Sequence, residues 1–212
     1  MHISSKSQRG LNLIEAIIFI LILAIALGAI ISVYIYTTRH SANTMLTLKT
    51  VELSQALMDE MLSKGYDENT PTGGGCVGSG ADTACNSSAT FSTFGIDPGE
   101  TRARFDDIDD FHDLAYCGDG VVTPDSSCSG ACNAFIDETG SSTDDLGKSL
   151  SSVYSGYSVC IKVSFAGNEM NNVNTISGTY EIIGNNDAKR IDLIVRDPLD
   201  ARLVSTAYKT NF

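Results

Sequence analysis

Four aspartates lie close together near the middle of the chain, between Phe105 and His112. They are Asp106, Asp107, Asp109 and Asp110. Calcium prefers such carboxylate oxygens and takes about 6 to 8 oxygen ligands. The spacing differs from that of an EF-hand, because no glycine stands at the required turn position. Two interpretations stay open, a calcium site and an acidic turn anchored in the core by Phe105 and Phe111, and the pattern favours the acidic turn.

The sequence offers no constellation of residues for catalysis. His112 has no second histidine nearby, and a zinc hydrolase would need one. Cys128 and Cys132 have CxxxC spacing, whereas a redox pair or a zinc site would use CxxC. A Gly-x-Ser-x-Gly elbow, a Walker loop and a dinucleotide fingerprint are all absent from the sequence. We therefore expect a protein that is not an enzyme and that, apart from the calcium alternative, uses no cofactor.

All six cysteines follow the apolar N-terminal region, which indicates an oxidising compartment on one side of a membrane. They are Cys76, Cys85, Cys117, Cys128, Cys132 and Cys160. We expect structural disulfides rather than reactive thiols. Four of the first five could pair locally, Cys76 with Cys85, and Cys117 with Cys128 or Cys132, but the sequence leaves the connectivity open.

One carboxylate, Glu15, stands at the start of an apolar run from Ala16 to Ile31. No side chain in that run carries a charge or a hydrogen-bonding group. A charged carboxylate in hydrocarbon costs at least about 2.5 kcal/mol. Such a residue is functional by default, although Glu15 could also sit at headgroup level beside an ordinary membrane anchor.

The segment Arg9-Gly10-Leu11-Asn12-Leu13-Ile14-Glu15, followed by the apolar run, resembles the class III signal of type IV pilins and type II secretion pseudopilins. The resemblance implies that a prepilin peptidase cuts between Gly10 and Leu11 and methylates the new N-terminus. Leu11 stands where phenylalanine is usual in the family, and Asn12 where threonine is usual. In a helical bundle of subunits, Glu15 of one chain would then meet the ammonium at Leu11 of its neighbour and set their register.

Two further segments resemble minor pilins of the mannose-sensitive haemagglutinin type, the MshD group. The first is the acidic segment at 105–112, and the second is Ser54 to Lys64 with Tyr66-Asp67-Glu68. This resemblance implies other major and minor pilins, an inner-membrane assembly platform and the inner-membrane lipid as partners.

The composition bounds the organisation of the chain. Its 212 residues suffice for one domain and an anchor, and the formal net charge is -12. Such an acidic chain argues against nucleic acid as a partner. The pattern predicts a leader at 1–10, a transmembrane or assembly helix at 11–36 and an amphipathic helix half at 37–65. A Gly/Asp/Cys-rich loop insertion at 66–152 and a sheet at 153–212 follow.

We predict one helix from Leu11 to Lys64, about 80 Å long at about 1.5 Å per residue, with Gly65 as its C-cap. Its second half repeats Leu46, Leu53, Leu57 and Met61 at helical spacing. Two alternatives are a free coiled-coil stalk for that half and an ordinary secretory signal cut after Ala24-Ile25-Ala26.

The C-terminal part shows period-two alternation, typical of strands. The predicted strands are 159–165, 180–183, 191–195 and 203–207, joined by turn residues. Laid on the amphipathic half of the helix, they would form an antiparallel sheet, so we predict an α+β, pilin-like fold. No cysteine follows Cys160, so the sequence leaves open how the C-terminus is held.

These observations favour a minor pilin that assembles into a type IV pilus and serves surface adhesion. It would cross the inner membrane once, with a periplasmic C-terminal domain, and become extracellular in the pilus. The alternatives are a minor pseudopilin of a type II secretion system, and an adhesin that binds through its disulfide-rich insertion. An anchored periplasmic enzyme is the least favoured class.

Overall fold

The fold was analysed in a computed structural model of the chain. It describes residues 13–71, 75–79, 85–121, 123, 125–137, 139–143, 149–169 and 184–211. The chain divides into two compact units, residues 1–45 and residues 46–212.

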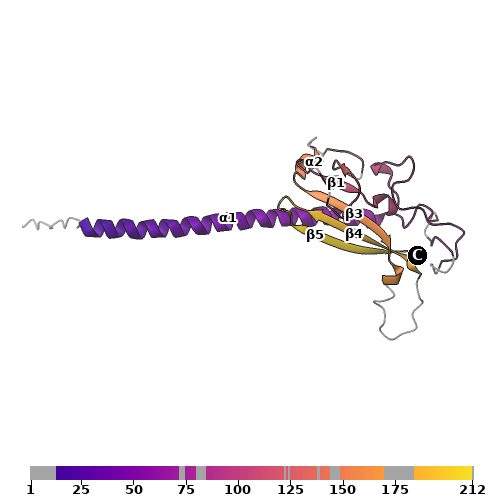
Figure 1. The fold of residues 1–212 in the computed structure, drawn as a ribbon, viewed down its shortest axis with the longest axis horizontal. Helices are drawn as coiled ribbons and strands as arrows, with labels where there is room; N and C mark the ends of the chain where they lie inside the picture. The colour runs from indigo at the N-terminus through magenta and orange to yellow at the C-terminus, as the bar shows by residue number, and fades with distance from the viewer. Residues whose placement is uncertain are drawn as a thin grey trace, which may run out of the picture. The chain divides into compact units, whose positions relative to one another are not determined.

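One long helix, α1, runs from Leu13 to Ser63 (Figure 1). The single predicted helix is therefore confirmed over the described residues, and it ends one residue before the predicted end. The helix continues through Gly28 and Ser32, and the Ser32 hydroxyl donates a hydrogen bond to the Gly28 carbonyl (2.9 Å).

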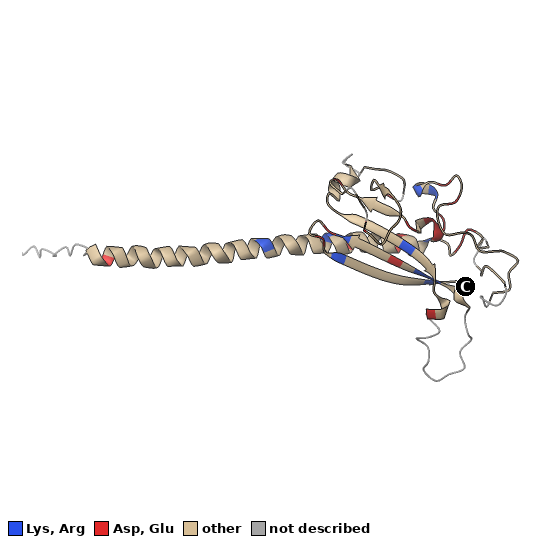
Figure 2. Ribbon diagram, in the orientation of Figure 1, with Lys and Arg blue, Asp and Glu red and all other residues tan. Residues whose placement is uncertain are grey.

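In the first unit, the large apolar side chains of α1 are exposed, including Phe19 (65 %) and Ile22 (60 %). No charged residue lies between Glu15 and Arg39 (Figure 2). The helix is long and apolar enough to cross a membrane, a property that an N-terminal signal sequence shares.

In the second unit, the remaining part of α1 is amphipathic, as predicted. Leu53, Leu57 and Met61 are buried and lie in the main hydrophobic core, with Leu46 packed against it. Because this stripe packs on its own chain, residues 46–63 are not a free coiled-coil stalk.

Three long antiparallel strands confirm most of the predicted C-terminal sheet. They are β3 (Ser158–Phe165), β4 (Ala188–Arg196) and β5 (Arg202–Thr210), with β4 between the other two. Ile161, Ile191 and Leu193 on these strands are fully buried. The predicted strand at 180–183 lies outside the described residues.

The prediction of a purely antiparallel sheet is wrong. Two short strands from the predicted insertion, β1 (Ala115–Cys117) and β2 (Cys132–Asn133), complete a five-stranded mixed sheet in the order β2-β1-β3-β4-β5. The β1–β2 pair is parallel and the β1–β3 pair antiparallel. Strands of two or three residues carry no readable alternation, so the sequence pattern could not reveal them.

Four short helical segments complete the described elements. They are the 3-10 helices η1 (Arg102–Arg104), η2 (Asp109–Phe111) and η3 (Asn185–Asp187), and the α-helix α2 (Leu150–Val153). The 66–152 segment contributes Phe105, Ile108, Phe111, Tyr116 and Phe135 to the core that α1 and the sheet share. The described residues of this segment therefore pack into the same core as α1 and the sheet.

The C-terminus is held by hydrogen bonds. The buried Asn211 side chain donates to the Val77 carbonyl and accepts from the Val77 amide, both at 2.8 Å. Val77 follows Cys76 directly, and Cys76 is bonded to Cys85. These two hydrogen bonds thus attach the C-terminus to the loop that the Cys76–Cys85 disulfide closes.

Candidate functional site

The end of α1 brings the acidic segment into place. Gly65 pairs with Asp107 in an isolated parallel bridge, donating from its amide to the Asp106 carbonyl (2.6 Å) and accepting from the Ile108 amide (3.2 Å). A Cβ on Gly65 would lie 3.1 Å from the Asp106 carbonyl oxygen, so glycine permits this close approach. Gly65 follows the last turn of α1, as predicted, but it does not adopt the left-handed conformation common at helix ends, since its φ is not positive.

Lys209 instead approaches the last carbonyls of α1. Its ammonium donates to the carbonyls of Leu62 (3.0 Å) and Lys64. A cation at this end of a helix complements the helix dipole and satisfies carbonyls that have no partner within the helix.

Three of the four predicted aspartates are buried. Asp107, Asp109 and Asp110 are each 2–3 % exposed, whereas Asp106 is exposed. The Asp107 carboxylate accepts hydrogen bonds from the amides of Asp109 (2.7 Å) and Asp110 (3.2 Å).

The predicted anchors of this turn are confirmed. Phe105 and Phe111 are buried and pack edge to face, with ring centroids 5.2 Å apart. The acidic residues therefore lie on a turn whose flanks are fixed in the core.

The structure does not bring the four aspartates together as one ligand set. Among the described residues, the carboxylates of Glu68, Asp106 and Asp107 lie within 4.8 Å of one another, and so do those of Glu100, Asp106 and Asp110. Asp109 belongs to neither group. The calcium interpretation stays a prediction, and these two groups, which include Glu68 and Glu100, are where its ligands would come from.

Crowding and burial raise the pKa values of these acids. Burial, followed by the charge of Asp110, raises the pKa of Glu100 to about 7. Burial, followed by the charge of Asp109, raises the pKa of Asp107 to about 7. Part of the cluster therefore holds protons near neutral pH in the absence of a cation.

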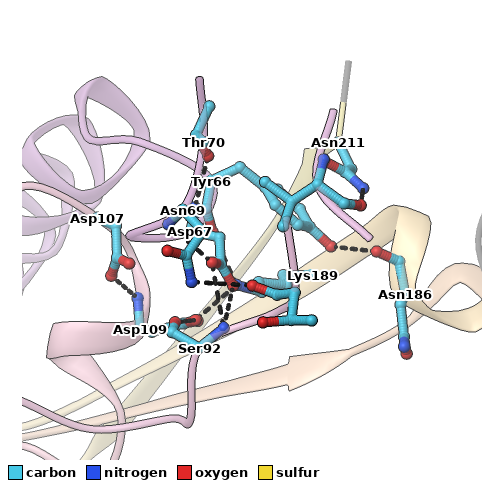
Figure 3. A network of polar contacts seen from close by, with 12 residues as sticks. Tyr66, Asp67, Asn69, Thr70, Ser92, Asp107, Asp109, Asn186, Lys189 and Asn211 are labelled. Carbon is cyan, nitrogen blue, oxygen red and sulfur yellow. Dashed lines mark hydrogen bonds and ion pairs between the residues drawn. The ribbon is translucent and has the colours of Figure 1, made fainter. Parts of the chain in front are cut away.

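Asp109 belongs to a second, deeper group centred on Lys189 of β4 (Figure 3). The Lys189 ammonium donates to Asp109 Oδ2 (2.6 Å), to the Tyr66 carbonyl (2.8 Å) and to Asp67 Oδ2 (3.2 Å). The side chains of Lys189 and Asp67 are 0 % exposed and that of Asp109 is 3 % exposed. Two carboxylates thus share one ammonium in the interior.

This group was not predicted from the sequence, although the sequence carries one signal for it. On β4, Lys189 has the same parity as the buried residues Ile191, Leu193 and Val195. Because side chains alternate between the two faces of a strand, Lys189 is expected on the face that points into the core. A lysine is almost never fully buried without a partner of opposite charge.

A second buried ion pair joins α1 to the insertion. Arg102 of η1 donates two hydrogen bonds to the two carboxylate oxygens of Glu60, and the side chains are 4 % and 11 % exposed. The guanidinium also lies 4.9 Å from the ring centre of Phe111. Sequence spacing gave no signal for this pair, because its partners are 42 residues apart.

All six cysteines form disulfides, as predicted. Cys76 pairs with Cys85, and of the two partners left open for Cys117 the structure has Cys132. Cys128 pairs with Cys160 and links the insertion to β3.

His112 has a structural role here. Its Nδ1 accepts a hydrogen bond from the Val163 amide (3.2 Å), and its ring lies 5.2 Å from that of Phe94. The imidazole therefore supports the packing of η2 against β3.

The predicted processing and assembly residues belong to the first unit. Gly10 and Leu11 lie outside the described residues. Glu15 lies in the first turn of α1 and is exposed, among exposed apolar side chains. Its carboxylate is thus accessible to a partner.

Comparison with family models, with curated proteins and with solved structures finds no match to this chain.

Proposed function

We propose that this chain is a minor subunit of a type IV pilus, similar to minor pilins of the mannose-sensitive haemagglutinin type. It is made as a precursor, cut by a prepilin peptidase between Gly10 and Leu11 and methylated on Leu11. It is held in the inner membrane by the first part of α1, with residues 46–212 in the periplasm. An assembly platform then transfers it into a fibre with other major and minor pilins, outside the cell, where it serves adhesion.

The observation that carries the proposal is the Gly10-to-Glu15 motif directly before an exposed apolar helix. An apolar helix surface without cover in its own unit needs lipid or other helices around it. A pilin meets both needs in succession, first in the bilayer and then in the fibre. The lone carboxylate of Glu15 fits the same account, because a neighbour's N-terminal ammonium would neutralise it.

Mass spectrometry of the mature N-terminus tests the processing step. We expect an N-methylated Leu11, and we expect Gly10→Glu to leave uncut precursor in the membrane. A mature chain that starts just after Ala26 would instead indicate an ordinary secretory signal, and normal processing of Gly10→Glu would refute the peptidase assignment.

Incorporation into sheared fibres tests the assembly step. We expect Glu15→Leu to reduce incorporation strongly, because it removes the partner of the neighbouring ammonium. Glu52→Leu is the matched control, since Glu52 is an exposed glutamate on the same helix. Equal incorporation of Glu15→Leu and the parent would rule out the charge-pairing step.

A cavity in the second unit favours an adhesin as a second candidate. It measures about 390 Å³, and the residues around it include Phe135, Leu150 and Tyr154 together with the Glu60–Arg102 ion pair. Aromatic walls with a few polar groups are typical of small-ligand sites. In fibres that assemble normally, Tyr154→Ala would then reduce surface attachment, while the exposed control Tyr208→Ala would not.

A further inference from the structure

The Lys189 group contains an amine, a carboxyl group and a second carboxylate in contact, shut off from water. The three side chains come from distant parts of the sequence: Asp67 follows α1, Asp109 begins η2, and Lys189 lies on β4. Figure 3 shows both carboxylates directed at the lysine. This arrangement is independent of the pilin proposal, because it lies entirely within residues 46–212.

Aromatic rings surround the Lys189 nitrogen and keep water away from it. The Lys189 nitrogen lies 4.4 Å from the ring centre of Tyr66, and 5.6 Å from those of Phe94 and Phe165. A desolvated lysine surrounded by apolar groups is the form in which its amine acts as a nucleophile. A buried ammonium beside two carboxylates leaves one negative charge in excess, and this excess disfavours ionisation of both carboxyl groups at once.

The two aspartates differ in a way that assigns them different roles. Asp67 accepts hydrogen bonds from the amides of Asn69 (3.1 Å) and Ser92 (3.1 and 3.2 Å), which fix the position of its side chain beside Lys189. Asp109 Oδ1 is buried and has no hydrogen-bond partner among the described residues. Burial is also the largest influence on Asp109, and it raises the pKa of that carboxyl group. Asp109 is thus suited to the neutral acid, and Asp67 to the base.

We infer that Lys189 and Asp109 condense into an intramolecular amide cross-link, with Asp67 as the proton carrier. The Lys189 ammonium first gives a proton to the Asp109 carboxylate, which leaves a neutral amine and a neutral acid. The bond from Lys189 Nζ to Asp109 Cγ then forms, and the carbonyl electron pair moves onto oxygen.

The remaining proton transfers pass through Asp67. Its carboxylate takes a proton from the attacking nitrogen and delivers it to the departing hydroxyl group as the Cγ–O bond breaks. One water molecule leaves, Asp67 is again ionised, and no group is oxidised or reduced. The product is a neutral amide in place of a buried ion pair, so the reaction removes two desolvated charges.

The cross-link would join η2 to β4 across a sequence separation of 80 residues. The Cys128–Cys160 disulfide already ties the same insertion to β3. Together they would bind the insertion covalently to two adjacent strands, one bond sensitive to reductants and the other not. Such a domain resists pulling and proteases even after reduction.

Tryptic digestion of the full chain, purified in detergent, reduced and alkylated, tests this directly. Trypsin cuts after Arg104, Lys148, Lys162 and Arg190, and an acylated Lys189 is not cut. We expect peptide 105–148 joined to peptide 163–190, with a mass one water below their sum. Free peptides ending at Lys189, without the joined species, would overturn the inference. Joining of Lys189 to peptide 65–102 would overturn the assignment of Asp109.

Variants check the assigned roles without depending on a single substitution. Lys189→Arg and Asp109→Ala should abolish the joined peptide, and Asp67→Asn should strongly reduce it. Asp109→Asn should still give the same joined peptide, because the amide then releases ammonia in place of water. Lys162→Arg is the matched control on the exposed face of β3, and it should leave the joined peptide unchanged. A full yield from Asp67→Asn would refute the proton-carrier role.

Discussion

In residues 13–45 the large apolar side chains lie on the surface, whereas in residues 46–212 the interior holds charged side chains. Leu13 is 78 % exposed, while Lys189 and Asp67 are buried. In both units, these side chains need contacts that residues next to them in the sequence do not provide. The first needs apolar cover from outside itself, and in the second the buried cations Lys189 and Arg102 are matched by carboxylates from distant segments.

This contrast predicts that the two units tolerate different substitutions. The hydrophobic interaction is non-directional, so replacing one exposed apolar residue of the first unit by another should change its free energy in an apolar environment little. A buried ion pair is directional, and removing one member leaves the other without solvation.

Two charges in the apolar part of α1 should have the largest effect. Ile18→Lys with Ile22→Lys places lysines one helical turn apart on an exposed apolar face, and each costs about 2.5 to 3.5 kcal/mol at a bilayer centre. We expect loss of the chain from carbonate-washed membranes, measured by immunoblot. Ile18→Leu with Ile22→Leu should stay in the membrane fraction. Full retention of the lysine variant would contradict the need for apolar cover.

Breaking the Glu60–Arg102 pair should destabilise the second unit by about 3 to 5 kcal/mol. Arg102→Met leaves the nearly buried carboxylate of Glu60 without its partner. Chemical unfolding of the full chain in detergent would measure the change. Arg104→Met in the same 3-10 helix is exposed and should change stability by less than about 0.5 kcal/mol. The double variant Glu60→Leu with Arg102→Met should recover part of the loss, and similar values for the two arginines would argue against a buried pair.

Removing Cys128–Cys160 should cost about 3.5 kcal/mol, because it closes a long loop of sequence separation 32. Removing Cys76–Cys85, with separation 9, should cost about 2.5 to 3 kcal/mol. Chemical unfolding of variants in which both cysteines of one disulfide are replaced by alanine would measure the loss of stability for each disulfide. The reverse order would show that the insertion holds to β3 without its disulfide.

The smallest effect should be a dependence on pH. Glu100 and Asp107 have raised pKa values of about 7, so the folded state binds protons that the unfolded state releases. Their stabilisation is present below their unfolded pKa values, near 4, and is lost as pH rises through about 7. We expect the free energy of unfolding to decline between about pH 5 and about pH 8, with the buried Asp107 contributing more than the partly exposed Glu100, which solvent screens. Glu100→Gln should flatten this dependence and the exposed control Glu52→Gln should not, whereas stability that rises with pH would contradict it.

Elements with a strong local period could be predicted from the sequence. The stripe of Leu53, Leu57 and Met61 predicted the amphipathic half of α1, and the alternation of β3 and β4 predicted antiparallel strands. Phe105 and Phe111 could be assigned to the core because large aromatic residues flanked an acidic turn. Each of these signals is carried by residues close together in the sequence.

Features that join distant segments could not be predicted in this way. The short strands β1 and β2 lack a period, and their parallel pairing depends on how the insertion folds over β3. The partner of Cys128 lies 32 residues away, on β3. From the sequence, the four aspartates of the acidic segment could not be distinguished. In the structure, Asp109 forms a buried ion pair with Lys189, whereas Asp106 is exposed.

The sequence alone determined the long helix, its apolar first half with Glu15, the three long strands and the disulfide-bonded character of the chain. These follow from hydrophobic periodicity and residue type, which act over a few residues. Only the tertiary structure decided which charges are buried together, as with Asp67, Asp109 and Lys189. The reason is physical, because the energy of a buried charge depends on atoms within a few ångströms in space, and folding chooses those atoms from anywhere in the chain.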